Sequence, residues 1–208
     1  MLTEKDKKFM EVLNAEFSEG LEAVPEEGNE KLVAVFGSAR TKETERAYIE
    51  AVKLGNILGL NKYQVITGGG PGIMQAAQQG CFLAGGQTIG MNIILPMEQN
   101  PNPYQKVSVN FNYFFTRKVC FYKRLKAITV FQGGYGTIDE MFEALTLIQT
   151  HKMQNIPIVL VGKAFWTGLK EWIVNVMLEA GAISSEDPDM FTIVDTAEEA
   201  FEIIKKEV

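Results

Sequence analysis

The chain has few of the side chains that metal and thiol chemistry require. Its 208 residues include one histidine, His151, and two cysteines, Cys81 and Cys120, which lie far apart and form no CxxC pair. One histidine and two separated cysteines are too few for a zinc site, and they argue against a histidine-dependent catalytic triad. No metal site is therefore predicted. Two separated cysteines instead indicate reduced thiols in apolar surroundings, which is the expectation for a cytoplasmic protein.

Long hydrophobic runs and an excess of positive charge are also missing. The apolar runs have the length of strands, so no transmembrane helix is expected. The first 17 residues carry charges throughout, which predicts that they are not a secretory signal. A formal net charge of -6 argues against broad electrostatic binding to nucleic acid or to an anionic membrane. This net charge still allows a local basic pocket.

The standard nucleotide-binding fingerprints are absent as well. The segment Phe36–Arg40 follows an apolar run but lacks GxGxxG, and the chain contains no GxxxxGK[ST] motif. Both observations weaken a dinucleotide-binding or P-loop interpretation.

What the chain does contain is a regular alternation of two patterns. Strand-length apolar runs are expected at 32–36, 63–67, 88–95, 106–110, 128–131, 158–161 and 191–194. Helical patterns fall between and after them, at 44–60, 73–83 and 113–126, from after Gly136 to about 149, and at 165–179 and 197–206. This order predicts an α/β fold with a doubly wound, mostly parallel sheet and helices on both faces.

The N-terminal region is expected to stand apart from this domain. Residues 3–18 have apolar side chains at helical spacing, with Thr3 as a possible N-cap, and residues 19–30 are polar enough for a linker. We therefore divide the chain into a helix and linker at 1–30 and the α/β domain at 31–208. A further loop is expected at 96–103.

Three glycine-bearing loops follow strands, after Phe36, Thr67 and Phe131. The carboxyl ends of parallel strands lie at one edge of a sheet, where ligands bind near the reversal of strand order. In the third loop, glycines lead directly into a helix whose unpaired N–H groups and dipole favour an anion. The sequence therefore predicts an anion-binding site at this edge.

Two charged residues near this edge admit alternative interpretations. Arg117 lies in an aromatic and basic helix, either on a solvated face or as a clamp for a phosphate or a transition state. Glu140 either stabilises the helix dipole or acts as an ionised general base or stabiliser of developing positive charge. Its neighbour Asp139 is assigned a first-turn dipole or capping role. The residues alone leave these alternatives open.

The motifs resemble those of a known family. Residues Gly133–Glu140, GGYGTIDE, are similar to the PGGxGTxxE signature of the Lonely Guy family of cytokinin riboside 5′-monophosphate phosphoribohydrolases, long described as possible lysine decarboxylases. Residues Gly68–Met74 resemble the first glycine-rich motif of that family, and Arg117-Lys118 resembles its Arg-Lys pair. The resemblance runs from about Val33 to Glu207.

This resemblance implies a Rossmann-like fold that cleaves the N-glycosidic bond of a purine nucleoside 5′-monophosphate, of cytokinin or adenosine type, without a cofactor. It also implies a homodimer or a larger homo-oligomer. Arg117 and Glu140 match the catalytic pair of the family. The substrate-binding residues implied in the same way are Ser38, Gly69, Gly70, Met74, Lys118, Gly133, Gly134, Gly136 and Thr137.

The chain departs from the family pattern at two positions. Gln132 stands where the motif has proline, and Asp139 stands where glutamate is commoner. Two rival functions also remain. One is a pyridoxal-phosphate decarboxylase, which requires a Schiff-base lysine in a matching pocket. The other is a nucleotide-binding or sensing module without turnover, which would need neither Arg117 nor Glu140 for catalysis.

Overall fold

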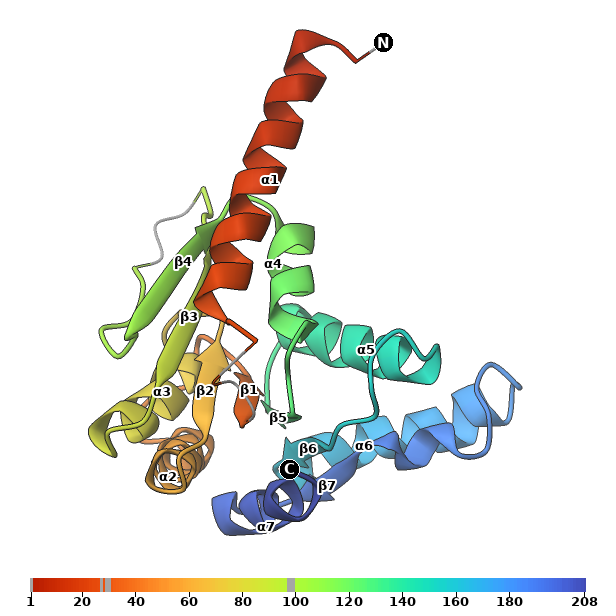
Figure 1. Cartoon of the computed structure of the whole chain (residues 1–208). Helices are drawn as coiled ribbons and strands as arrows, with labels where there is room; N and C mark the ends of the chain where they lie inside the picture. The colour runs from red at the N-terminus through yellow and green to blue at the C-terminus, as the bar shows by residue number, and fades with distance from the viewer. Residues whose placement is uncertain (1, 27, 29–30, 97–99) are drawn as a thin grey trace.

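The computed structural model describes the chain except for residues 1, 27, 29–30 and 97–99. Its centre is a parallel sheet in the order β4-β3-β2-β1-β5-β6-β7 (Figure 1). The strands are β1 Leu32–Phe36, β2 Gln64–Thr67, β3 Thr88–Ile93, β4 Val107–Phe111, β5 Ala127–Phe131, β6 Ile158–Val161 and β7 Thr192–Val194. The predicted α/β architecture is thereby confirmed, and the described strands are all parallel.

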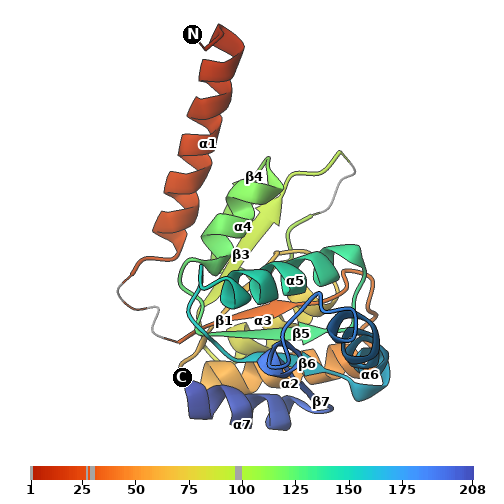
Figure 2. The same cartoon turned by 90° about the vertical axis from the view of Figure 1, so that its right-hand side faces the viewer.

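Helices cover both faces of the sheet (Figure 2). Helices α2 (Arg46–Leu60), α3 (Ile73–Leu83) and α7 (Ala197–Glu207) pack on one face. The other face carries α1 (Glu4–Ala23), α4 (Phe114–Tyr122), α5 (Tyr135–Gln149) and α6 (Lys163–Trp172). A π-helical segment, η1 (Ile173–Leu178), continues α6, and a short 3₁₀ turn, η2 (Asp187–Met190), precedes β7.

Strand β1 shows why this arrangement suits the sequence. All five of its residues are buried, with Val33 and Val35 in the core of one face and Leu32, Ala34 and Phe36 in the core of the other. A strand between two layers of helices needs apolar residues on both faces, so its sequence is continuously apolar. The same strand pairs with β2 on one side and β5 on the other, so the strand order reverses there. Ligand-binding crevices form beyond such reversals.

The N-terminal helix differs from its prediction. Thr3 is the predicted N-cap and forms a capping box with Asp6, but the helix continues to Ala23, so residues 19–23 are helix and not linker. The reason is tertiary packing: Gly20 is buried and lies directly against Cys120 of α4. The outer half of α1 projects away from the sheet (Figure 1). Of the predicted linker, residues 27 and 29–30 lie outside the described residues.

Other helix and strand boundaries differ from the predicted ones by a few residues. Helix α4 ends at Tyr122 and not at Lys126, because the N–H of Lys126 already bonds to the carbonyl of Leu32 at 2.9 Å and leads the chain into β5. In the loop predicted at 96–103, residues 97–99 are outside the described part of the chain. Within the described residues, no helix combines the length and the apolar character that crossing a membrane requires.

Candidate active site

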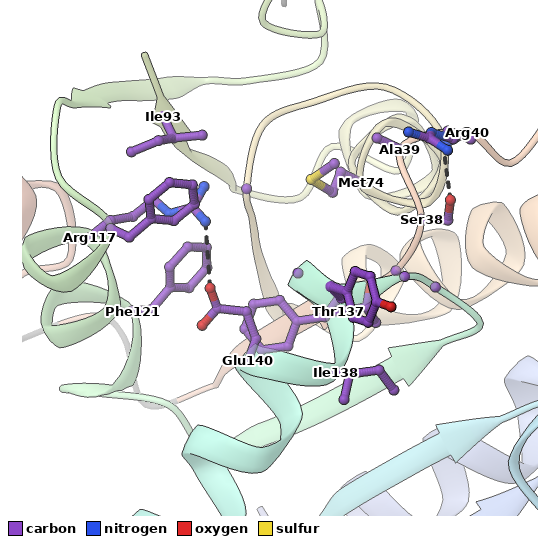
Figure 3. A pocket seen from close by; sticks show the side chains of 18 of the residues that line it. Ser38, Ala39, Arg40, Met74, Ile93, Arg117, Phe121, Thr137, Ile138 and Glu140 are labelled. Atoms are coloured by element: carbon purple, nitrogen blue, oxygen red, sulfur yellow. Dashed lines mark hydrogen bonds and ion pairs between the residues drawn. The ribbon is translucent and has the colours of Figure 1, made fainter. Parts of the chain in front are cut away.

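A cavity of about 740 Å³ opens beyond the carboxyl ends of β1 and β5, at the reversal of strand order (Figure 3). The loop after β1, the first turn of α3, helix α4 and the first turns of α5 contribute to its walls. The structure therefore brings together segments that are about 100 residues apart in the sequence. Eight of the predicted site residues line it: Ser38, Met74, Arg117, Gly133, Gly134, Gly136, Thr137 and Glu140.

The glycine loop after β5 forms the floor of this cavity. A Cβ atom on Gly133 would lie 2.1 Å from Oγ1 of Thr137, so the tight turn into α5 admits only glycine at that position. Gly134 is the N-cap of α5 and offers no side-chain acceptor to the first turn. The N–H groups of Thr137 and Ile138 donate to the carbonyl of Gly134, both at 3.1 Å, whereas those of Tyr135 and Gly136 have no backbone acceptor among the described residues. These two N–H groups can face an anion, and the helix dipole favours negative charge there.

Ser38 connects this floor to the neighbouring loops. Its N–H donates to the carbonyl of Gln132 at 3.0 Å, and its own carbonyl accepts from the N–H of Ile73 at 3.0 Å. Its hydroxyl accepts from the N–H of Arg40 at 3.0 Å (Figure 3). Gln132, which replaces the motif proline, thus contributes a backbone carbonyl that ties β5 to the loop after β1. These bonds fix the position of the Ser38 hydroxyl at the cavity wall.

Arg117 of α4 and Glu140 of α5 both line the cavity, and their side chains point toward each other (Figure 3). Nη2 of Arg117 lies 3.5 Å from Oε1 of Glu140, and the two residues are 9% and 5% exposed. The predicted catalytic pair therefore forms a buried ion pair in the same cavity as the start of α5. A buried charge that lacked this partner would be strongly disfavoured.

The guanidinium of Arg117 packs against aromatic rings. Its centre lies 5.1 Å from the ring of Phe114 and 5.9 Å from that of Phe121. Burial lowers the pKa of Arg117, while the charge of Glu140 opposes that change, and the guanidinium remains protonated. Among the described residues, Nε of Arg117 has no hydrogen-bond partner. This nitrogen is itself buried, so it is an unsatisfied polar group inside the wall and not an exposed ligand contact.

Lys118 lies behind this pair and does not line the cavity. Its Nζ is 2.7 Å from Asp139, 3.6 Å from Glu140 and 3.7 Å from Glu143. Burial would lower the pKa of Lys118, but the hydrogen bond to Asp139 and the three carboxylates outweigh burial and raise it. The ammonium group therefore offsets the repulsion among three acids, and its contact with substrate stays a prediction.

The ion pair with Lys118 corrects the role of Asp139. No acidic residue lies in the first turn of α5, so Asp139 neither caps that helix nor occupies its first turn. The prediction was wrong because the helix begins at Tyr135, and Asp139 therefore lies in the second turn. Its carboxylate pairs with Lys118 instead.

Gly69 and Gly70 were also expected in the cavity wall, but only their neighbour Gly68 reaches it. Gly69 has a φ of +74°, and a Cβ atom there would lie 1.9 Å from Oδ1 of Asn92. The carbonyls of Gly69 and Gly70 accept hydrogen bonds from the side-chain amide of Asn102, at 2.9 and 3.0 Å. Asn102 therefore buttresses this turn beside the cavity, and a substrate contact of Gly69 and Gly70 stays a prediction.

Sequence reasoning missed Tyr122, the last residue of α4. Its hydroxyl donates to the carboxylate of Glu140, with 2.7 Å to Oε2, and lies 2.8 Å from the main-chain oxygen of the same residue. Burial raises the pKa of Tyr122, and the adjacent charge of Glu140 raises it further. In the sequence this tyrosine is one of several aromatic residues in α4, and only the contact between α4 and α5 distinguishes it.

Glu16 of α1 was missed for a similar reason. It is buried, and its carboxylate accepts hydrogen bonds from the N–H and side-chain amide of Asn112, at 2.7 and 2.8 Å, and from the hydroxyl of Thr116. Burial would raise the pKa of Glu16, but these hydrogen bonds outweigh it and lower the pKa. Because Thr116 precedes Arg117, this carboxylate from the N-terminal helix anchors the first turn of α4. A spacing of 100 residues hides such a pair from any local pattern.

A model of the family described as "Possible lysine decarboxylase" matches residues 74–204. The match contains Arg117, Glu140 and the glycine loop before α5, whereas the loop at 68–72 precedes it.

Two curated relatives carry nucleotide-cleaving names. The chain is 29% identical over 163 residues to the "Pyrimidine/purine nucleotide 5'-monophosphate nucleosidase" of Escherichia coli strain K12, which covers 71% of this chain and 35% of the relative. The chain thus spans about a third of the length of that nucleosidase. It is 28% identical over 177 residues to the "Cytokinin riboside 5'-monophosphate phosphoribohydrolase" of Mycobacterium tuberculosis, which covers 81% of this chain and 90% of the relative.

Among solved structures, the chain is similar to the molybdenum cofactor binding protein from the phototrophic bacterium Rippkaea orientalis. The TM-score is 0.61 at 21% identity, covering 84% of this chain and 95% of that one. At this identity the likeness shows a shared fold.

Proposed function

We propose a hydrolase function for this chain, which belongs to the possible lysine decarboxylase family, also called Lonely Guy. In this proposal it hydrolyses the N-glycosidic bond of a nucleoside 5′-monophosphate. The products are a free base and ribose 5-phosphate. The observation that carries the proposal is the Arg117–Glu140 pair, buried at 3.5 Å, in the same cavity as the glycine-rich start of α5. The names of the two relatives agree with this reaction.

In this proposal the start of α5 holds the phosphate. The N–H groups that follow Gly133 and Gly134 supply donors, and the phosphate anchors the substrate away from the reacting atoms. Glu140 lies four residues after Gly136, which is about 6 Å along the helix at about 1.5 Å per residue. A ribose bound through its 5′-phosphate therefore spans the distance between the anchor and the carboxylate.

The carboxylate of Glu140 then faces the anomeric carbon. Glycoside cleavage develops positive charge on the ribose, which an adjacent carboxylate stabilises while it orients the attacking water. The C1′–N bond breaks with its electron pair on the base, the water oxygen bonds to C1′, and the proton lost by the water balances the charge of the departing base. Arg117, which lines the same cavity, holds an oxygen of the substrate beside Glu140.

For the base we propose a purine, of adenine or cytokinin type. Apolar side chains form the wall next to Arg117, from α3, the end of β3 and the start of α4. An apolar wall favours a flat ring, and it accepts an apolar substituent at little cost. The wall residues concerned are Met74, Ile93, Leu95 and Phe114.

A decarboxylase function fits the site poorly. A Schiff-base lysine must reach the cofactor as a free amine, so its pKa must be low. The carboxylates around Lys118 raise its pKa, and the ammonium group lies outside the cavity wall. Incubation with pyridoxal phosphate and lysine should therefore give neither carbon dioxide nor an aldimine absorbance band.

The alternative function is a nucleotide-binding module without turnover. The feature that favours it is the anion site at the start of α5, which binds phosphate whether or not Glu140 is present. The two functions differ in one respect: only hydrolysis requires the carboxylate.

The deciding experiment incubates the protein with AMP and with isopentenyladenosine monophosphate, and measures free base and ribose 5-phosphate by chromatography. Glu140→Gln should lower kcat by about 10²-fold or more, the scale of losing a positioned acid–base group, with nucleotide binding by calorimetry retained. Glu143→Gln is the matched control, since Glu143 lies one turn further along α5 and pairs with the same Lys118 at 3.7 Å. Release of base from no purine or pyrimidine monophosphate refutes the enzymatic proposal.

We further propose a cytoplasmic homodimer or larger homo-oligomer. Half-exposed apolar side chains gather on α1 and α4 beside the cavity, which supports self-association through this surface. They are Phe9, Met10, Phe114, Phe115 and Val119. A monomer in light scattering at assay concentration contradicts this part of the proposal.

A further inference from the structure

The hydroxyl of Tyr122 is buried against the proposed catalytic carboxylate. Tyr122 is 6% exposed, and its ring belongs to the core between the sheet and helices α4 and α5. The hydroxyl lies 2.7 Å from Oε2 of Glu140 and 2.8 Å from the main-chain oxygen of the same residue. Among the described residues, both hydrogen-bond acceptors of this hydroxyl therefore belong to Glu140.

The lengths of the contacts show which neighbour orients the carboxylate. A distance of 2.7 Å to Oε2 is typical of a strong O–H···O bond, whereas the 3.5 Å from Arg117 to Oε1 is at the limit of hydrogen bonding. The ammonium group of Lys118 is 3.6 Å from Oε2 and closer to Asp139, at 2.7 Å. Arg117 and Lys118 supply charge, but the directional bond comes from Tyr122.

We infer that Tyr122 is a positioning residue for Glu140: it holds Oε2 in the core so that Oε1 faces Arg117 and the cavity. The inference rests on the proposed function, in which Glu140 acts on the ribose. A carboxylate that is fixed before the substrate binds need not lose side-chain freedom in the transition state. Removing the bond should therefore slow turnover without weakening the phosphate anchor.

The position of Tyr122 in α4 strengthens this role. Arg117 and Tyr122 lie on the same helix, so one rigid element presents both the guanidinium and the hydroxyl to Glu140. Burial and the charge of Glu140 both raise the pKa of Tyr122, so the hydroxyl remains a donor throughout the pH range of the assay.

The kinetic test is Tyr122→Phe, which keeps the ring in the core and removes only the hydroxyl. We expect kcat to fall by roughly tenfold or more, the scale of losing one hydrogen bond to a charged group, with KM and nucleotide affinity unchanged. The matched control is Tyr63→Phe, another buried tyrosine, which packs against Phe201 far from the cavity. It should leave kcat unchanged.

The double variant separates positioning from a general structural effect. If Tyr122 acts through Glu140, adding Tyr122→Phe to Glu140→Gln should cause little further loss of kcat, because the group being oriented is already gone. Multiplicative losses, or a Tyr122→Phe enzyme with the wild-type kcat, would overturn the inference.

A spectroscopic measurement tests the pair even without turnover. With ¹³Cζ-labelled tyrosine, the resonance of Tyr122, assigned by its absence in Tyr122→Phe, should move in Glu140→Gln at neutral pH, because the charged acceptor of its hydroxyl is gone. If the wild type releases no base but this difference is present, the proposed function fails while the Tyr122–Glu140 contact stands. A Tyr122 resonance at the wild-type position in Glu140→Gln refutes the contact itself.

Discussion

Replacing Glu16 by alanine should detach the N-terminal helix from the segment that carries Arg117. The carboxylate of Glu16 is 4% exposed and accepts two hydrogen bonds from Asn112 and one from Thr116. Asn112 and Thr116 flank the start of α4, and Arg117 follows immediately. The change therefore removes an acceptor from three donors that lie between α1 and the site.

The expected loss follows from these contacts. A buried donor left without a partner costs about 1–3 kcal/mol. The two donors of Asn112 share one carboxylate oxygen, and the hydroxyl of Thr116 retains a second acceptor in the carbonyl of Tyr113 at 2.9 Å. We therefore expect a loss of about 3 kcal/mol, a large part of the roughly 5–15 kcal/mol that stabilises a typical domain. For a chain of 208 residues this lowers Tm by about 6–12 °C.

The pH dependence has a definite sign. The pKa of Glu16 in the folded protein is lowered from its ordinary value of 4.5, so the ionised form stabilises the fold. This contribution is present above pH 4.5 and is lost as the pH falls below that value toward the folded-state pKa. Glu16→Ala should therefore differ from the wild type most at neutral pH, and the difference should shrink in acid.

The assay is urea denaturation of the wild type, Glu16→Ala and Glu16→Gln at pH 7 and at pH 4. Glutamine keeps an oxygen that can accept from Asn112, so it should restore most of the stability, but without the acid-dependent step. Glu16→Ala with a wild-type midpoint at pH 7 would refute the reasoning. The reasoning would also be refuted if Glu16→Ala were less stable than the wild type by the same amount at both pH values. The loss of stability would then come from burial and not from ionisation of Glu16.

Gly20→Ala should destabilise the protein by about 1–3 kcal/mol, the usual cost of overpacking, because the new Cβ would lie 2.5 Å from Sγ of Cys120. The control Gly168→Ala, in an open part of α6, meets nothing within 4 Å and should be stabilising by about 0.5–1 kcal/mol; urea midpoints measure both. Burial raises the pKa of Cys81 and of Cys120 to about 11, so at pH 8 only about one thiol in a thousand is ionised. Ellman's reagent should therefore label them slowly in the native protein and rapidly in urea, and fast native labelling would contradict their burial.

Local patterns were sufficient for the order and type of the elements. Strand β1 was predictable because a strand buried on both faces must be apolar throughout, and α3 was predicted at its observed bounds, Ile73–Leu83. The predicted bounds were less accurate where an element is stabilised by contact with a residue distant in the sequence. Helix α1 extends past residue 18 because Gly20 allows close contact with Cys120, and no pattern within residues 1–30 contains that information.

The candidate site divides in the same way. Glycine loops at the ends of strands and a helix that starts with glycine are local features, so the sequence by itself determined the parallel α/β fold, the edge where an anion site is predicted and the candidates Arg117 and Glu140. The tertiary structure alone decided which side chains surround Glu140: Tyr122 holds its carboxylate, and Lys118 pairs with its neighbour Asp139. It also showed that Asn102 buttresses the turn at Gly69 and Gly70. The physical reason is that backbone preferences act over a few residues, whereas hydrogen bonds and ion pairs depend on how separate helices pack.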